Sequence, residues 1–235
     1  CLNAANGIGY TVSTTAGYTY NWLITNGSQS SGGTTGSIGV NFTNNGTATV
    51  SVIAVNPFGC PADTVSKTVF IRNLPAAVAG NDISFCSGGS AVLGGPSTAG
   101  VTYSWSPSTG LNNATISNPT VTVTNGTGSP QSTTYILTTT LNGCINSDTV
   151  VVTTNPFPVA NAGNNVSICS GSSAPVGSLP TAGFTYSWFP STGISNPGIA
   201  NPVITLTTSN STPDTLFYAV IVQNSFGCND SDTVQ

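Results

Sequence analysis

One motif, written three times at a fixed interval, constrains this chain more than any other feature. Residues 98–110 read Thr-Ala-Gly-Val-Thr-Tyr-Ser-Trp-Ser-Pro-Ser-Thr-Gly, residues 181–193 repeat the motif, and residues 15–22 hold a partial copy. The tryptophans in the three copies follow one another at an interval of 83 residues. A period of this length indicates an array of similar structural units. We therefore predict three modules, each large enough for one small core, at residues 1–73, 74–155 and 156–235.

The residue pattern inside each module predicts β-strands. Residues 18–24 and 48–55 alternate between apolar and polar side chains, as half-buried strands do. No segment shows a helical period, and Gly, Pro and Asn punctuate the chain at short intervals, so we predict an all-β fold of immunoglobulin-like β-sandwiches. Asn26-Gly27 is a hairpin signal between two strands of module one.

Charge is nearly absent, and this excludes several functions. The 235 residues include two Lys or Arg, six acidic residues that are all Asp, and no His. A nucleophilic triad lacks its usual base, and the only neighbouring carboxylates, Asp230 and Asp232, have the sequence context of solvated strand ends. We predict that the chain is not an enzyme. Two cations cannot form a nucleic-acid-binding patch or dock on anionic lipid, and the apolar run 216–222 is too short to span a bilayer.

Metal binding has weak support in the sequence. Calcium takes 6–8 oxygen ligands, often from several carboxylates, whereas the Asp residues here are scattered along the chain. We predict no cofactor. A calcium site at a module junction, near Asp82, stays open as an alternative, although Asn164 replaces this residue in the next module.

The six cysteines also follow the repeat. Each module has two, and the second cysteines stand at an interval of 84 residues. With no His and no Cys-x-x-Cys pair, zinc explains them poorly, whereas disulfides in an exported protein explain them well. Each bridge within a module would close a loop of about 60 residues and contribute about 3–4 kcal/mol; free buried thiols are the alternative. The predicted pairs are Cys1–Cys60, Cys86–Cys144 and Cys169–Cys228.

The recurring tryptophans allow two interpretations. They stand in alternating strands with the same neighbours each time, which favours a core position packed against an inter-sheet disulfide, as in immunoglobulin domains. The alternative is a set of exposed platforms on which sugars stack. The residues concerned are Trp22, Trp105 and Trp188.

Several segments resemble a known family. They are Ile-Cys-Ser-Gly-Ser at 168–172, the Tyr-Ser-Trp-x-Pro-Ser-Thr-Gly motif, Asn-Pro-Thr-Val-Thr-Val at 118–123 and Asn-Gly-Cys-x-x-Ser-Asp-Thr-Val at 142–150. These look like the Ig-like or PKD-like repeats of large Bacteroidetes surface proteins, including gliding-motility adhesins and proteins exported by type IX secretion. Module one resembles a PKD-like variant. The resemblance implies exported, elongated, non-catalytic arrays that act as stalks, filaments or adhesins.

The tripeptide Asp-Thr-Val follows the second cysteine of every module, and Asp-Thr-Leu occurs once more. It resembles the O-glycosylation motif of exported Bacteroidetes proteins, which implies sugars on its threonine. The alternative is structural, with Asp ending a turn and Thr-Val beginning a strand. The acceptor threonines would be Thr64, Thr149, Thr215 and Thr233.

The two ends of the chain differ from its middle. Modules two and three begin with a leading segment, at 75–85 and 158–168, which module one lacks, and module three stops early in its last strand. We expect a window from a longer array; the alternative is that neighbouring subunits complete each other's sheets.

From these observations we expect an extracellular, cell-surface stalk or filament segment of an adhesin. Low charge favours side-to-side packing of chains, so the expected partners are neighbouring repeats, further copies in a homo-oligomeric fibre, and surface glycans or other cells. The alternative is a carbohydrate-binding or spacer region of a secreted polysaccharide-degrading enzyme.

Overall fold

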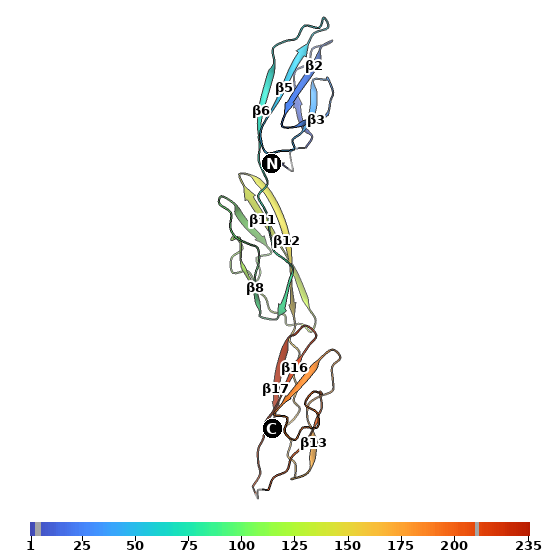
Figure 1. Cartoon of the computed structure of the whole chain (residues 1–235), viewed down its shortest axis with the longest axis vertical. Helices are drawn as coiled ribbons and strands as arrows, with labels where there is room; N and C mark the ends of the chain where they lie inside the picture. The colour runs from blue at the N-terminus through green and yellow to red at the C-terminus, as the bar shows by residue number, and fades with distance from the viewer. Residues whose placement is uncertain (3–5, 210–211) are drawn as a thin grey trace.

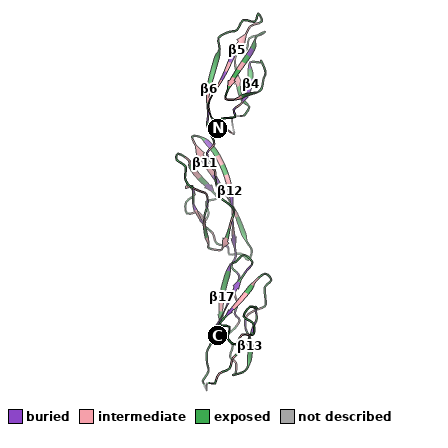
Figure 2. Ribbon diagram, viewed as in Figure 1, coloured by how far each residue is buried: buried purple, intermediate pink, exposed green. Residues whose placement is uncertain are grey.

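The chain forms an elongated rod of three all-β modules stacked end to end (Figure 1). The computed structural model describes residues 1–2, 6–209 and 212–235, and these contain no α-helix. Three separate hydrophobic cores lie along the rod, one within each of the ranges 1–73, 74–155 and 156–235. Buried residues alternate with more exposed ones along the longer strands, and Figure 2 shows the two kinds interspersed along the ribbon. The alternating sequence pattern therefore produces sandwiches with one buried and one solvated face per sheet.

Module one is built from two three-stranded sheets. One has the order β1-β4-β3 and the other β2-β5-β6, with all neighbours antiparallel. The core between them includes Val40, Phe42 and Val50, all almost fully buried. The strands are β1 (Ile8–Thr11), β2 (Thr19–Thr25), β3 (Ser28–Ser31), β4 (Ser37–Asn41), β5 (Gly46–Val55) and β6 (Val65–Ile71).

The hairpin predicted at Asn26-Gly27 is wrong. These residues do form a tight turn, with Asn26 at a φ of 55°. However, β2 pairs with β5, whereas β3 pairs with β4 in the other sheet. The turn therefore carries the chain from one sheet to the other. A Cβ on Gly27 would lie 2.8 Å from the carbonyl oxygen of Asn41, so the glycine serves a close approach of backbone segments at the crossing.

Module two has a four-stranded sheet, β7-β12-β11-β9, facing a two-stranded sheet, β10-β8. Its core contains Trp105, Tyr135, Leu137 and Val152. β7 runs parallel to β12, and its last residue, Cys86, stands beside Asn155. The strands are β7 (Ile83–Cys86), β8 (Ser90–Val92), β9 (Thr102–Ser106), β10 (Thr120–Thr122), β11 (Gln131–Leu141) and β12 (Cys144–Asn155).

Module three repeats this plan with a shorter last strand. Its sheets are β14-β16-β17 and β13-β15. Residues 166–169, which follow the leading segment, do not form a strand: Val166 donates its amide to Gln235 at 2.9 Å, but β17 does not extend beside the residues that follow. A cavity of about 410 Å³ opens onto the core there. The strands are β13 (Ser173–Pro175), β14 (Thr185–Phe189), β15 (Val203–Thr205), β16 (Tyr218–Gln223) and β17 (Asn229–Val234).

The repeated motif has a structural role in every copy. The amide of Thr98 donates to the hydroxyl of Tyr103 at 2.7 Å, and the amide of Val101 closes a turn on the Thr98 carbonyl. Gly100 has a φ of 76° in this turn, a conformation that glycine adopts without strain. The tyrosine hydroxyl accepts the equivalent amide in modules one and three, at 2.8 and 2.9 Å. Thr-Ala-Gly-x-Thr-Tyr is therefore a turn tied to its own strand.

The Pro-Ser-Thr-Gly part of the motif is held by a second tyrosine. The buried Tyr135 donates its hydroxyl to the carbonyl of Thr109 at 2.7 Å, and Tyr218 does the same to Thr192. Burial raises the pKa of both phenols above the ordinary value of tyrosine. These loops are thus rigid parts of modules two and three.

Candidate functional site

The disulfides lie between modules, and the predicted pairing within modules is wrong. Cys1 is bonded to Cys144, and Cys86 is bonded to Cys228. The remaining two cysteines, Cys60 and Cys169, are exposed thiols. The predicted pairs Cys1–Cys60, Cys86–Cys144 and Cys169–Cys228 do not form. Each bond instead joins the first cysteine of one module to the second cysteine of the next.

Strand geometry explains why the cysteines of one module cannot meet. Cys86 stands beside Asn155, the last residue of β12, whereas Cys144 is the first residue of that strand. Eleven steps along a strand span about 36 Å. A disulfide requires Cα atoms about 4.4–6.8 Å apart. The two cysteines of module two therefore occupy its opposite ends.

In module one, too, the two cysteines lie at opposite ends of the module. In module one the amide of Leu2 donates to the carbonyl of Arg72, just after β6, which places Cys1 at the far end of the module from Cys60. The N-terminus consequently lies at the junction with module two and not at the tip of the rod (Figure 1).

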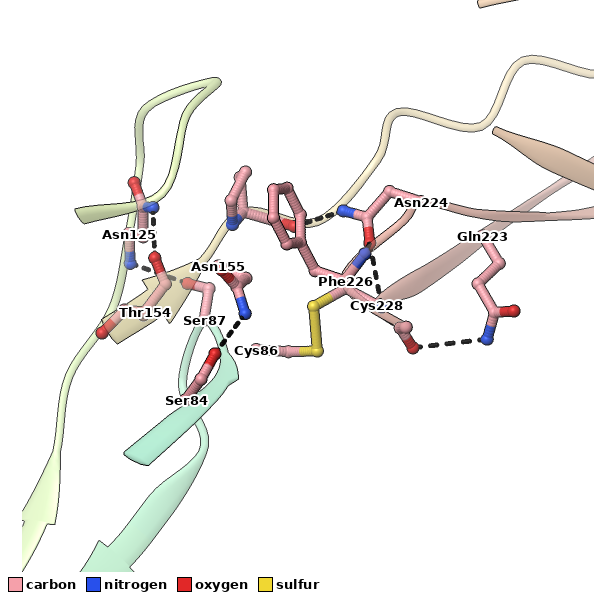
Figure 3. Close-up of a disulfide and its surroundings, with 12 residues drawn as sticks. Ser84, Cys86, Ser87, Asn125, Thr154, Asn155, Gln223, Asn224, Phe226 and Cys228 are labelled. Atoms are coloured by element: carbon pink, nitrogen blue, oxygen red, sulfur yellow. Dashed lines mark hydrogen bonds between the residues drawn. A yellow bond between two sulfur atoms is a disulfide. The ribbon is translucent and has the colours of Figure 1, made fainter. Parts of the chain in front are cut away.

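The junction between modules two and three is closed by Cys86–Cys228, with Cα atoms 5.7 Å apart (Figure 3). Cys228 is 1% exposed. Beside it, the side chain of Asn224 accepts the amides of Phe226 and Cys228, each at 3.0 Å, and donates to the carbonyl of Pro156 at 2.9 Å. One asparagine thus shapes the cysteine turn and ties it to the linker.

A layer of buried amides supports this junction from module two. Asn155 donates from its side chain to the hydroxyl of Ser84 at 2.7 Å, and its carbonyl accepts the amide of Ser87. Asn125 donates to the carbonyl of Thr154 at 2.8 Å (Figure 3). No buried side-chain nitrogen or oxygen of the described residues lacks a hydrogen-bond partner. The buried polar groups at this end of module two are therefore hydrogen-bonded within the module itself.

The junction between modules one and two is also closed by a disulfide, but the residues around the disulfide differ. Cys1 and Cys144 have Cα atoms 5.4 Å apart. Asn146 donates to the carbonyl of Pro75 at 2.9 Å, and the exposed Arg72 donates to the carbonyl of Asn142 at 3.3 Å. A hollow of about 440 Å³ lies between the two modules, lined by residues on both sides of the junction.

In modules two and three, the aspartate of the Asp-Thr-Val tripeptide binds the segment that leads into its module. The carboxylate of Asp148 accepts the amide of Ala79 at 2.8 Å, and Asp232 accepts that of Ala162 at the same distance. Each aspartate therefore anchors the leading segment that enters its module. This contact gives the aspartate a structural role in modules two and three. The threonines of these tripeptides and of Asp-Thr-Leu are all exposed to solvent: Thr64, Thr149, Thr215 and Thr233.

The tryptophans differ in exposure. Trp105 and Trp188 are 3% and 1% exposed, and each indole N–H donates to a loop carbonyl, that of Ile116 or Ile199. Trp22 is half-buried against the core of module one and donates to Thr35. Modules two and three cover their tryptophan with the long loop that module one lacks. None of the three packs against a disulfide, because the cysteines lie at the module ends.

The structure offers little support for a metal site. The carboxylate of Asp82 accepts the amide of Val151 at 2.8 Å. Within the described residues, no group of three or more His, Cys, Asp or Glu side chains is placed to hold a metal ion.

The described part of the chain also contains no helix of the length and hydrophobicity that crossing a bilayer requires.

The polar residues of the junctions were not predicted from the sequence. Asn125, Asn155 and Asn224 carry the hydrogen bonds around the second disulfide. In a chain so rich in Asn they are inconspicuous. The usable signal was the leading segment before Cys86, because a strand running beside the last strand must carry this cysteine to the far end of the module.

No protein-family model and no curated protein matches this chain. Solved structures resemble it in fold. An I-band fragment of titin aligns with a TM-score of 0.41 and 12% identity, over 97% of this chain and 92% of that one. Extracellular domains 3–5 of Drosophila OTK give 0.40 and 9%, over 98% and 91%. The human desmocollin-1 ectodomain gives 0.30 and 12%, over 93% and 50%.

These similarities concern tandem β-sandwich domains. The TM-scores are all below 0.5, so they carry no argument about function. The assignment of three tandem immunoglobulin-like sandwiches rests on the strands and cores of this chain.

Proposed function

We propose that this chain is a non-catalytic structural segment, a stalk or filament, of an exported cell-surface adhesin or fibre. The observation that carries the proposal is the position of the disulfides, because both bonds cross from one module to the next. A bond within a module would stabilise that module alone. A bond across a junction adds nothing to a binding surface and restrains the angle between modules.

The restraint has a mechanical consequence. Modules joined only by a linker and a small polar interface move relative to one another by default. Here each junction has two covalent connections, the backbone and the disulfide, at different points of the interface. Two attachment points suppress hinge motion, so the chain behaves as a stiff spacer whose length is set by the number of modules.

An oxidising, extracellular location fits these bonds, since disulfides persist in exported proteins and are rare in the cytosol. The resemblance of the cysteine and tryptophan motifs to Bacteroidetes surface repeats supports the same setting. The partners we propose are neighbouring repeats, further copies of the chain in a fibre, and glycans or other cells at the adhesive end.

Glycosylation of the Asp-Thr-Val threonines is part of the proposal. Exposure of Thr64, Thr149, Thr215 and Thr233 makes them accessible, and sugars would add the solubility that a nearly uncharged surface does not. Excess mass on these threonines, found by intact mass and peptide mass spectrometry of protein from native cell surfaces, supports this part. A bare peptide mass removes it without affecting the structural role.

The alternative function, a carbohydrate-binding or spacer region of a polysaccharide-degrading enzyme, requires exposed aromatic platforms. The buried positions of Trp105 and Trp188 remove two of the three candidates. A spacer without sugar binding remains compatible with the rod.

Small-angle X-ray scattering tests the mechanical function. The C60S/C169S variant removes the two exposed thiols and keeps both junction bonds, so it is the matched control. Adding C1S and C86S removes the junction bonds. We expect an elongated, rigid particle for the control and a broad, flexible ensemble for the second protein, with the modules still folded. Equal rigidity in the two proteins, or a compact control, would contradict a disulfide-stiffened rod.

A further inference from the structure

The hollow of about 440 Å³ between modules one and two has no part in the proposed stalk function. Its volume is within the range of sites that bind small ligands, and such sites occur preferentially where domains meet. Module one contributes Phe70 and Arg72, at the end of β6, and the turn that contains Asn45. Module two contributes the hairpin tip at Asn142. The hollow therefore has one wall from each module.

The wall from module two is the rigid tip of a hairpin. Leu141 pairs with Cys144, so Asn142 and Gly143 alone form the turn between β11 and β12. Both turn residues have a positive φ, 52° and 81°, as a two-residue type I′ turn requires. The disulfide from Cys144 to Cys1 holds this tip against module one.

The wall from module one is also held in place. The ladder between β5 and β6 runs up to the residues directly beside Asn45 and Arg72. The carbonyl of Arg72 accepts the amide of Leu2 at 2.9 Å, next to the disulfide. From the other side, the side chain of Asn26 donates to the carbonyl of Asn45 at 3.4 Å. The backbone of this wall is thus fixed from both flanks.

The side chains of the hollow combine an aromatic ring, a cation and amides. The ring of Phe70 is 65% exposed and provides an apolar surface. Arg72 is exposed and is one of only two cations in the sequence. The amides, which both donate and accept hydrogen bonds, are those of the exposed Asn45, Asn73 and Asn142. The described residues that line the hollow include no carboxylate.

The guanidinium of Arg72 has donors that the chain itself does not use. It carries five N–H groups in a planar fork, and its hydrogen bond within the described residues goes to the carbonyl of Asn142 at 3.3 Å. Such a fork matches a carboxylate with two parallel hydrogen bonds. Because no acidic residue lines the hollow, its electrostatic potential favours a negatively charged ligand.

Closure of a junction does not require these groups, as the second junction shows. Phe226 stands there at the position of Asn142, since each lies two residues before the second cysteine of its module. Asn155 stands at the position of Arg72, because the carbonyl of each accepts the amide of the residue after a bonded first cysteine. The cation and the amide tip therefore belong to the first junction.

We propose that the hollow between modules one and two binds a carboxylated sugar, a uronic-acid unit of an acidic polysaccharide. The guanidinium of Arg72 pairs with the carboxylate, and the ring of Phe70 packs against the C–H face of the sugar. The asparagine amides exchange hydrogen bonds with the sugar hydroxyls. The disulfide lines no part of the hollow and holds its two walls at a fixed separation.

A sugar fits this set of groups better than other anions do. One cation beside an apolar ring and several uncharged amides suits a polyol that carries one negative charge per unit, whereas nucleic acids are held by many cations. The inference rests on the proposed function, which has glycans among its partners, and it names the class of glycan and the place where it binds.

Binding is measured on the C60S/C169S chain, which keeps the disulfide of this junction. The probe is the trimer of galacturonic acid, titrated while the backbone amides are followed by NMR, and the amides of residues 70, 72 and 142 report on the hollow. Two control ligands separate the parts of the probe. Galactotriose has a similar sugar ring without the carboxylate, and triglutamate has carboxylates without a sugar.

Two charge variants form a matched pair. Arg72→Gln removes the cation of the hollow, and Lys67→Gln removes the other cation of the chain, which does not line the hollow. We expect the first variant to bind the galacturonate trimer at least about tenfold more weakly, the ratio that about 1.4 kcal/mol produces, and the second to bind it as the parent does. Phe70→Ala should weaken binding about threefold or more. Unchanged amide shifts away from the hollow verify that each variant is folded.

Saturable shifts confined to the hollow, lost in Arg72→Gln and kept in Lys67→Gln, support the proposal. Equal weakening by the two charge variants would overturn it, because the effect would then be one of net charge. So would galactotriose or triglutamate binding as tightly as the galacturonate trimer, full binding by Phe70→Ala, or the absence of saturable shifts at the hollow.

Failure here is distinguishable from failure of the proposed function. A chain that scatters as a rigid rod and does not bind the trimer contradicts only the sugar site. A flexible chain contradicts the structural function itself, whether or not it binds the trimer.

Discussion

The two junctions of the rod share a disulfide and differ in nearly everything around it. Between modules two and three, the buried Asn224 ties the cysteine turn to the linker, and a layer of buried asparagines supports the opposing end. Between modules one and two, the contacts are the exposed Arg72 and the partly buried Asn146, beside a hollow of about 440 Å³.

The disulfide is the part of the junction that both copies share. The hydrogen bonds vary from one junction to the other, whereas the first cysteine of a module meets the second cysteine of the next in both. The covalent bond is therefore the common clamp, and the polar contacts adjust how firmly each junction closes around it.

The largest effect should come from opening one junction at a time in the C60S/C169S background. C1S/C144S removes the first disulfide and C86S/C228S the second. We expect the first change to produce the greater flexibility, because the second junction retains the bond from the buried Asn224 to Pro156, the residue directly after β12. Scattering ensembles, together with limited proteolysis in linkers 72–78 and 155–161, measure this. Equal flexibility would show that the hydrogen bonds contribute nothing.

A smaller effect should follow from removing the carboxylate that anchors a leading segment. Asp148→Ala leaves the amide of Ala79 without its acceptor and should destabilise module two by about 2 kcal/mol, the value of a charge-assisted hydrogen bond. That corresponds to a fall in Tm of about 8–16 °C for a module of this size.

The matched control for this prediction is Asp63→Ala in module one. No leading segment contacts Asp63 within the described residues, so its loss should change stability by less than about 0.5 kcal/mol. Calorimetry of both variants decides the matter. Equal losses would mean that the contact with the leading segment contributes nothing to stability.

The asparagine of the cysteine turn gives a narrower comparison. Asn224→Ala removes two bonds inside the turn and one to Pro156, whereas Asn56→Ala removes only the two inside its turn. We expect the first variant to cost about 1 kcal/mol more, the net value of one hydrogen bond. Hydrogen exchange of the amides of residues 226 and 58 reports the local opening of each turn, and the same protection loss in both would contradict the role of the linker bond.

The smallest effect should come from Arg72→Ala. Its bond to the carbonyl of Asn142 is exposed and 3.3 Å long, so stability should change by less than about 0.5 kcal/mol. The scattering profile should stay that of the parent rod. A marked increase in flexibility would mean that this single contact, and not the disulfide, sets the angle of the first junction.

Much of the architecture followed from the sequence, because local patterns determine it. The 83-residue period gave three modules, and alternation around Trp105 and Trp188 placed both side chains inward. The turn at Asn26-Gly27 was predicted correctly, but the prediction that its two flanking strands pair as a hairpin was wrong. A tight turn permits a hairpin without requiring one, and the pairing of β2 with β5 is decided by packing across the whole module.

The cysteine pairing could not be read from spacing. Two pairings of Cys86 agree equally well with the period of the repeat. One is with Cys144 in its own module, and the other is with Cys228 in the next. Only the direction of β7 distinguishes them, because a strand parallel to β12 carries Cys86 to the end opposite Cys144. The junction asparagines depend on that pairing, so they were missed with it.

Disulfide mapping by mass spectrometry of the non-reduced protein, after proteolysis under conditions that prevent thiol exchange, distinguishes bonds between modules from bonds within them. We expect cross-linked peptides that contain Cys1 with Cys144 and Cys86 with Cys228. Peptides that join Cys1 to Cys60, or Cys86 to Cys144, would contradict it, since they would place the bonds within modules and remove the clamp from both junctions.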